Sequence, residues 1–337
     1  MQSYLAVLIL LILMLFPPVI MAGGLPVKGQ IPSEEAFITF RDNQQEIILS
    51  IDLLSTDADT AIIFPVPTPA EVEMVSDDQL FTYLAEATQP QIQIEERLVW
   101  LDSPQPITNN EILAHSDGEI IDNYNIDQFT ASEISTLQRW IEDYSHNLPV
   151  RANSILQTYA NQGWSFVAIT FGGDRPIDST LRSIRFTFET DKIIYPMMLS
   201  SLMNEPFDIT LYVMTDHRVD ISEMETHYAS LVDKLDPAPP DEITTYFSGT
   251  FLTKLVASQI PPTSITADFV AQPAATNDFF QQTMIQIHEV SGWDRMSGPI
   301  LGVAAVVAMN ALVIGFALGL KYHMLRLAGP EPEESGK

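Results

Sequence analysis

The chain has 337 residues, no cysteine, and 16 lysines and arginines against 44 aspartates and glutamates, which gives a formal charge of -28. So acidic a surface repels phosphate backbones, and we therefore expect no nucleic-acid partner. The lack of cysteine excludes disulfides, thiol catalysis and zinc sites built on thiolates.

The N-terminal residues 1–22 predict a signal peptide. Residues 4–16 are apolar, a length typical of a signal-peptide core, and the small residues Ala22 and Gly23 offer a cleavage point. No lysine or arginine precedes the apolar stretch. An uncleaved anchor therefore stays open as an alternative.

Residues 30–257 predict an extracytoplasmic domain of the α+β class. Its first part shows the composition of strands at 36–40, 46–53 and 60–64, with a turn at Asp42-Asn43. A capping box beginning at Ser76 opens a short helix, and residues 91–101 alternate as a strand. We expect a mostly antiparallel sheet with short helices packed on it, because strands and helices do not alternate strictly.

Residues 102–128 are polar and loop-like, and they carry the candidate metal ligands. Asp117, Glu119, Asp122 and Asp127 crowd this loop, and carboxylates are the ligands that calcium prefers. The spacing fails the EF-hand pattern, so calcium is a weak candidate and a solvated acidic loop is the default interpretation. The metal is otherwise unknown.

The second part of the domain predicts two helices followed by strands. One helix follows the capping box Thr130–Glu133, and a second follows Pro149 and ends at Gly163. The apolar spacing places Trp140 and Trp164 in the core rather than at a sugar-binding surface. Three further strands and one helix are expected, at 164–171, 182–189 and 207–214, and at 222–235 for the helix. The last strand expected in this domain is at 247–257.

Catalytic signatures are absent from the sequence. No Gly-x-Ser-x-Gly, Ser-x-x-Lys or His-Glu-x-x-His spacing occurs. Asp216-His217 places an acid next to a histidine, but neighbouring residues of a strand point to opposite faces. The catalytic residues are therefore unknown, and no cofactor-binding residue is predicted.

The C-terminal region predicts a membrane anchor. Residues 258–297 have the composition of a stalk, with an amphipathic helix around 279–287. Residues 298–320 carry no charge and, at 1.5 Å per residue, cover roughly 34 Å, enough for a transmembrane helix. Lys321, His323 and Arg326 follow, so the tail 321–337 is expected in the cytoplasm and the N-terminus outside.

One face of the predicted membrane helix carries small side chains. Such a face permits close packing with another helix, and an amide beside it can bond across the contact. We therefore predict a homo-oligomer or a membrane protein partner through Ala304, Ala308, Asn310, Ala311, Gly315 and Gly319.

The order of the segments resembles a bacterial family of extracytoplasmic proteins named domain of unknown function 2330. The likeness is carried by residues 61–72 (AIIFPVPTPAEV), 137–171, 179–199 and 250–255 (TFLTKL). The resemblance implies a secreted domain with a signal peptide, often followed by a membrane segment. It implies no activity.

The leading functional hypothesis is a single-pass, membrane-anchored binding or interaction protein. The alternatives are a membrane-tethered hydrolase that uses carboxylates and an accessory subunit of a membrane complex. Carboxylates or a histidine that converge in a deep pocket would favour the enzyme. A flat surface would favour binding.

Overall fold

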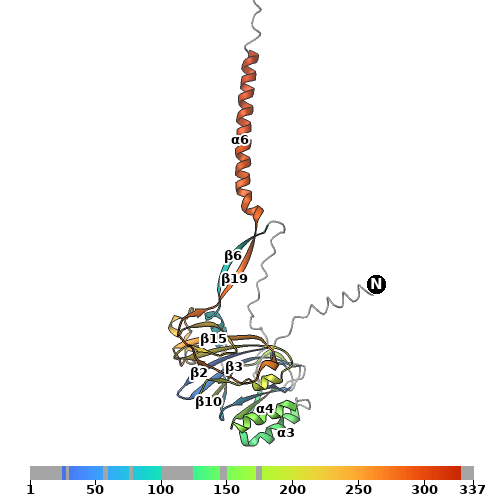
Figure 1. The fold of residues 1–337 in the computed structure, drawn as a ribbon, viewed down its shortest axis with the longest axis vertical. Coiled ribbons are helices and arrows are strands. Elements are labelled where there is room, and N and C mark those ends of the chain that lie inside the picture. The colour runs from blue at the N-terminus through green and yellow to red at the C-terminus, as the bar shows by residue number, and fades with distance from the viewer. Residues whose placement is uncertain are drawn as a thin grey trace, which may run out of the picture. The chain divides into compact units, whose positions relative to one another are not determined.

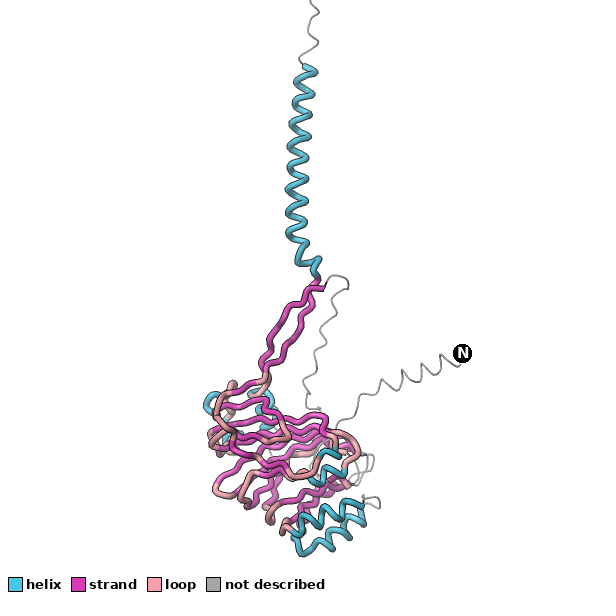
Figure 2. Tube along the Cα trace, viewed as in Figure 1, coloured by secondary structure: helices cyan, strands magenta, loops and turns pink. Residues whose placement is uncertain are grey.

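The computed structural model describes residues 25–27, 30–55, 60–75, 79–99, 124–144, 150–171 and 177–327 (Figures 1 and 2). The chain divides into two compact units. The first comprises residues 1–91 and 113–283, and the second comprises residues 92–112 and 284–337.

A nine-stranded sheet forms the centre of the first unit. All its neighbouring strands are antiparallel except β2 and β12, which are parallel. In sheet order the strands are β18 (Phe280–Gln281), β14 (Glu225–Leu231), β15 (Phe251–Ile260), β12 (Phe207–Thr215), β2 (Ser33–Arg41), β3 (Gln44–Ser55), β10 (Ile184–Glu189) and β5 (Glu71–Met74), with β9 (Ile177–Thr180) also paired to β3.

A four-stranded antiparallel sheet packs on one face of the nine-stranded sheet. It consists of β1 (Leu25–Pro26), β4 (Thr60–Val66), β8 (Ser165–Phe171) and β7 (Tyr124–Phe129), in that order. Along β8, Val167 and Ile169 belong to the core shared with the nine-stranded sheet, whereas Phe166 and Ala168 belong to a second core. Successive strand residues point to opposite faces, so both faces of this sheet are buried.

Helices cover the outer side of each sheet. The second core is completed by α3 (Ile134–Tyr144), which follows the short helix η1 (Ala131–Glu133), and by α4 (Val150–Asn161) and η2 (Met198–Leu202). A third core lies on the opposite face of the nine-stranded sheet, which we call the outer face, under α2 (Gln79–Ala87) and α5 (Asp241–Thr244). The first unit therefore has four layers: helices, sheet, sheet, helices. The expected α+β class with a mostly antiparallel sheet is confirmed.

Local signals in the sequence placed several of these boundaries. Asp42 and Asn43 both have positive φ, 51° and 61°, and connect β2 to β3 in a two-residue turn. Gly163 has φ 82° and ends α4, as a glycine with no Cβ can. Trp164 is buried in the second core and Trp140 packs against it.

The expected helix at 222–235 is wrong. Half of that segment forms β14, followed by the short helix η3 (Val232–Lys234). The capping-box pattern at Ser222 is local, whereas β14 fills the sheet between β15 and β18, and tertiary pairing overrides helix propensity. The loop predicted at residues 102–128 also differs, because its last described residues, 124–128, belong to strand β7.

The structure also differs from the stalk expected at 258–297. Short strands pair this segment with the first unit, because its apolar residues Phe269 and Ala271 are buried there. The pairs are β16 (Phe269–Val270) with β11 (Ile194–Tyr195) and β17 (Gln272–Pro273) with β13 (Val219–Asp220), and η4 (Pro262–Ser264) precedes them. The amphipathic helix expected at 279–287 is replaced by strands.

The second unit contains a two-stranded ribbon and a long helix. The ribbon pairs β6 (Gln91–Val99) with β19 (Thr283–Ser291), and α6 (Gly292–Leu327) follows directly. The expected segment 298–320 lies within α6. Over the described residues, no helix is found whose length and apolarity would let it cross a membrane. The predicted signal peptide, residues 1–22, and the part of the predicted tail beyond residue 327 lie outside the described residues.

Candidate functional site

A row of polar and aromatic side chains crosses the outer face of the nine-stranded sheet. Lys254 on β15 lies opposite Tyr212 on β12 and opposite Tyr228 on β14. Tyr212 and Tyr228 belong to the third core, so their side chains lie on the outer face of the sheet. Glu35 on β2 and His227 on β14 extend the row, because the charge of Glu35 acts on the pKa of Lys254 and the charge of Lys254 acts on the pKa of His227. We call these five residues the Lys254 row.

Lys254 is the cation at the centre of the row. Its ammonium nitrogen lies 5.2 Å from the centroid of the Tyr212 ring, a cation–π distance, and the side chain is half-buried. Burial lowers the pKa of Lys254 below its ordinary value, and the negative charge of Glu35 opposes that change. Lys254 therefore begins to lose its proton at a lower pH than an exposed lysine does.

His227 stands on an irregularity of β14. The register between β14 and β15 shifts between Thr226 and Tyr228, so His227 is an extra residue facing Lys254. Burial and then the charge of Lys254 lower the pKa of His227, while Glu225, with Oε2 4.0 Å from Nε2, opposes the change. The imidazole is therefore kept neutral near pH 7.

The tyrosines of the row are kept as neutral phenols. Burial makes the largest contribution to the raised pKa of Tyr212, and the negative charge of Glu35 raises it further. Burial also raises the pKa of Tyr228. Neighbouring Tyr83 on α2 donates its hydroxyl hydrogen to the carbonyl of Pro237 at 2.9 Å, which ties α2 to the loop below the row.

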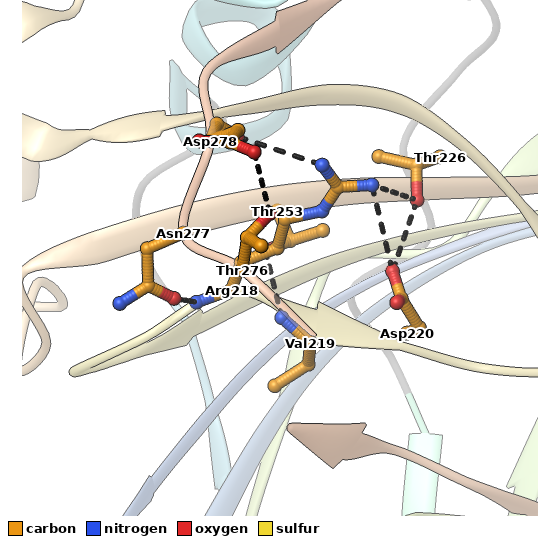
Figure 3. A network of polar contacts seen from close by, with 8 residues as sticks. All are labelled: Arg218, Val219, Asp220, Thr226, Thr253, Thr276, Asn277 and Asp278. Atoms are coloured by element: carbon orange, nitrogen blue, oxygen red, sulfur yellow. Dashed lines mark hydrogen bonds and ion pairs between the residues drawn. The ribbon is translucent and has the colours of Figure 1, made fainter. Parts of the chain in front are cut away.

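A polar network around Arg218 holds the strands that carry Lys254 and His227 (Figure 3). Its Nη2 lies 3.5 Å from Thr226 Oγ1 and 3.6 Å from Asp220 Oδ1. The backbone N–H of Val219 donates to Thr253 Oγ1 at 3.4 Å. Thr226 and Thr253 directly precede His227 and Lys254 in the chain, so the network fixes the position of both strands.

The same network fixes the outermost strand. The Arg218 guanidinium lies 5.9 Å from the centroid of the Phe280 ring and donates to the carbonyl of Asp278 at 3.5 Å. The backbone N–H of Arg218 donates to the side-chain oxygen of Asn277 at 2.9 Å (Figure 3). Next to it, Phe279 packs edge-on against Tyr228 at 6.0 Å between centroids and remains 61% exposed. An exposed aromatic side chain therefore adjoins the Lys254 row.

The predicted calcium ligands do not form a site in the described part of the chain. Asp117, Glu119 and Asp122 lie outside the described residues, and Asp127 is exposed on β7. No group of three or more His, Asp or Glu side chains able to hold a metal ion occurs among the residues that the structure describes. The calcium hypothesis therefore stays an expectation.

The other predicted site residues lie apart from the row. Asp216 and His217 lie in the turn after β12, where the hydroxyl of Thr215 donates to the His217 carbonyl. Asn310 donates its side-chain N–H to the carbonyl of Val306 in its own helix at 2.8 Å. The small residues expected as a helix contact, Ala304, Ala308, Ala311, Gly315 and Gly319, all lie within α6.

Two carboxylates do converge on the outer face, but a cation separates them. Arg185 on β10 pairs with Glu73 on β5, and its Nη1 lies 3.9 Å from Glu46 Oε2 on β3. Burial raises the pKa of Glu46, and the charge of Arg185 opposes the change. One guanidinium therefore serves both acids, as in a structural ion-pair cluster.

Sequence reasoning missed the Lys254 row because its members come from four strands. One signal was available: Leu252 and Lys254 share a face of the strand expected at 247–257, so a charged residue stands at a position of the buried face. Such a position needs a partner or a role.

The fold and the site define an α+β domain with two packed, mostly antiparallel sheets and a polar row on its outer face. The family profile described as "Uncharacterized protein conserved in bacteria (DUF2330)" matches residues 27–272. The chain belongs to this family, and the resemblance seen in the sequence is confirmed.

Two further comparisons add little. A search of curated proteins finds no match. Among solved structures, the crystal structure of baculovirus P35 is similar over 77% of this chain and 99% of that chain, with 7% identity and a TM-score of 0.36. A similarity of this degree carries no argument about function.

Proposed function

We propose that this protein is a membrane-anchored, extracytoplasmic binding protein whose contact surface is the outer face around the Lys254 row. The observation that carries the proposal is the exposed ring of Phe279 on the buried ring of Tyr228, beside Lys254. Exposed aromatic side chains next to cations are typical of binding hot spots. The sequence shows no catalytic signature that competes with this interpretation.

The anchor is supported by the segment 298–320. It carries no charged residue, and the described apolar side chains of α6 are exposed, with Leu312 and Phe316 each 74% accessible. An apolar helix surface of this kind needs a cover, and the proposal is that lipid provides it. The positive residues after it favour a cytoplasmic tail.

Extraction of membranes tests the anchor. The full chain should stay in the membrane pellet after alkaline carbonate, whereas Val313→Arg, a charge at the middle of the segment, should release a larger share. A full chain that is extracted like a peripheral protein would end the anchor part of the proposal.

Affinity capture tests the contact surface. The detergent-extracted full chain should retain a partner that is lost with Phe279→Ser. Met74→Ser is the matched control, because Met74 is also exposed, at 53%, but lies on β5 at the other edge of the sheet. Equal loss with both variants would contradict the assignment of the surface.

The alternatives have weaker support. For a carboxylate hydrolase, the acids that meet on the outer face, Glu46 and Glu73, share Arg185 and so lack a free pair. For an accessory subunit or a homo-oligomer, the small face of α6 is the motivation, and Gly315→Leu in a membrane two-hybrid assay tests it. An unchanged signal would remove the helix contact.

A further inference from the structure

We propose that the two-stranded ribbon of β6 and β19 is completed by a third strand, an extended segment of a basic partner protein that alternates apolar and positively charged side chains. The ribbon belongs to the second unit, whereas the Lys254 row belongs to the first. The inference therefore concerns a different surface from the binding function proposed above and does not depend on it.

The ribbon exposes large apolar side chains that a larger sheet would bury. On β6, Ile92 is 60% and Ile94 is 65% exposed, and on β19, Ile285 is 59% and Ile287 is 50% exposed. An isolated two-stranded sheet is at best marginally stable in water, and a third strand or a packed face stabilises it. The ribbon (Figure 2) therefore offers a surface that another strand would cover.

Both strands of the ribbon have a backbone edge open to strand addition. In the part of the chain that the structure describes, β6 and β19 pair with each other and with no other strand. The start of the ribbon is held in place, because the backbone N–H of Gln91 donates to the carbonyl of Gln282 at 2.8 Å. An extended peptide adds to such an edge through main-chain hydrogen bonds, and its alternate side chains contact the neighbouring strand.

The two strands of the ribbon carry the same short sequence pattern. β6 reads Ile-Gln-Ile-Glu-Glu at residues 92–96, and β19 reads Ile-Gln-Ile-His-Glu at residues 285–289. Because alternate residues of a strand point to the same face, each strand places two isoleucines and then a glutamate on one face. A complementary strand presents two apolar side chains and then a lysine or arginine at the same spacing.

Charge decides between the candidate occupants of the ribbon. The two strands carry the acids Glu95, Glu96 and Glu289 and the base Arg97. A second copy would bring together two chains of formal charge -28, and charged residues on an edge strand oppose the pairing of identical edges. An anionic lipid surface would be repelled in the same way. A basic strand is attracted instead, so the charge complementarity favours a basic protein partner.

A labelled peptide tests the proposal. The probe is a fluorescent peptide of alternating valine and lysine, and the control peptide alternates valine and glutamate. Binding to the full chain, extracted in an uncharged detergent, is followed by fluorescence anisotropy. We expect the valine–lysine peptide to bind, with an affinity that falls as salt is added, and the valine–glutamate peptide not to bind. Equal binding of both peptides would overturn the proposal, because apolar adhesion alone would then explain it.

Hydrogen exchange shows where the peptide binds. The valine–lysine peptide should slow amide exchange in residues 91–99 or 283–291, because a third strand protects the edge that it joins. Exchange in β5, an edge strand of the nine-stranded sheet, should stay unchanged. Protection at β5, or no protection in the ribbon, would overturn the assignment of the surface.

Variants of the ribbon test its side chains one by one. Ile94→Ser should weaken binding of the valine–lysine peptide about tenfold, since it removes an apolar anchor. Met74→Ser is the matched control and should change nothing, because Met74 is also exposed but lies on β5 in the first unit. The double variant Glu96→Lys and Glu289→Lys should transfer the preference to the valine–glutamate peptide. A retained preference for lysine, with native circular dichroism, would contradict the charge complementarity.

Two further measurements separate this surface from its competitors. If light scattering finds a dimer of the full chain that Ile94→Ser dissociates, a second copy covers the ribbon and the basic partner is overturned. Phe279→Ser should leave peptide binding unchanged, because Phe279 belongs to the first unit. Peptide binding that is lost with Phe279→Ser would place the peptide on the outer face and contradict the assignment to the ribbon.

Discussion

Glu34 on β2 lies opposite Ile51 on β3, on the face of the nine-stranded sheet that packs against the four-stranded sheet. Its other neighbour, in register on β12, is Ile209. The side chain is 1% exposed, and neither carboxyl oxygen has a hydrogen-bond partner among the residues that the structure describes. Burial raises the pKa of Glu34 to about 8, so the carboxyl group is neutral at pH 7.

The first prediction concerns stability against pH. In the unfolded chain Glu34 has the ordinary pKa of 4.5, whereas in the folded chain the pKa is about 8. Between these values the folded protein holds a proton that the unfolded chain releases. Its contribution to the free energy of unfolding is therefore complete below pH 4.5 and is lost as pH rises toward 8, by at most about 1.4 kcal/mol per pH unit.

Glu34→Gln should remove this dependence, because the amide stays neutral. Urea unfolding of the full chain between pH 5 and pH 8 should show a shallower decline in the variant than in the parent. Glu205→Gln provides the control, since Glu205 is exposed. Parallel stability curves for the parent and Glu34→Gln would refute the assignment.

The second prediction concerns Asp268, which joins three distant segments. Its Oδ1 accepts the backbone N–H groups of Met197 at 2.7 Å and Met198 at 3.0 Å, and also the hydroxyl of buried Tyr159. Asp268→Ala leaves all three donors without this acceptor and should lower the free energy of unfolding by about 2–4 kcal/mol.

Tyr159→Phe is the matched variant for this site. It removes one donor and leaves the two backbone bonds, so thermal or urea unfolding should show a cost of about 1 kcal/mol. An Asp268→Ala cost no larger than that of Tyr159→Phe would mean that the backbone bonds contribute nothing to stability.

The third prediction compares two glycines. A Cβ at Gly249 would lie 2.6 Å from the carbonyl oxygen and 2.8 Å from the nitrogen of Thr215, where β12 and β15 meet. Gly249→Ala must displace backbone and should cost about 2 kcal/mol or more. At Gly163, nothing lies within 4 Å of such a Cβ, so Gly163→Ala should cost only the strain of its positive φ, about 1 kcal/mol. Equal losses of stability, measured by urea unfolding, would contradict the steric explanation.

Local patterns predicted much of the fold. The turn at Asp42-Asn43, the capping box at Thr130 and the helix end at Gly163 each act through neighbouring atoms, so a single sequence contains them. The segment 222–235 shows the limit. It contains the residues of a capping box, but the backbone of β14 pairs with β15 and β18, which lie further along the chain.

The Lys254 row could not be predicted for the same reason. Its contacts depend on the register of four strands, and a register shift of one residue would turn each side chain to the other face. Lys254 itself stands at a detectable position, but Tyr212 and His227 become its neighbours only when the strand order is known. The buried state of Glu34 is hidden too, because Glu35 beside it is equally acidic and half-exposed.

The last prediction concerns Gln45, a fully buried amide on β3. Its Nε2–H donates to the carbonyl of Ile194 at 2.7 Å, and its Oε1 accepts the Ile194 N–H at 2.9 Å. In Gln45→Glu the ionised carboxylate cannot donate and faces a carbonyl oxygen, so burial should favour its protonated form. Urea unfolding should show a loss of about 2–5 kcal/mol at pH 8 and a smaller loss at pH 5. Gln93→Glu, at an exposed position of β6, should change little at either pH. If Gln45→Glu were equally stable at both pH values relative to the parent, the paired hydrogen bonds to Ile194 would not be what holds β11 against β3.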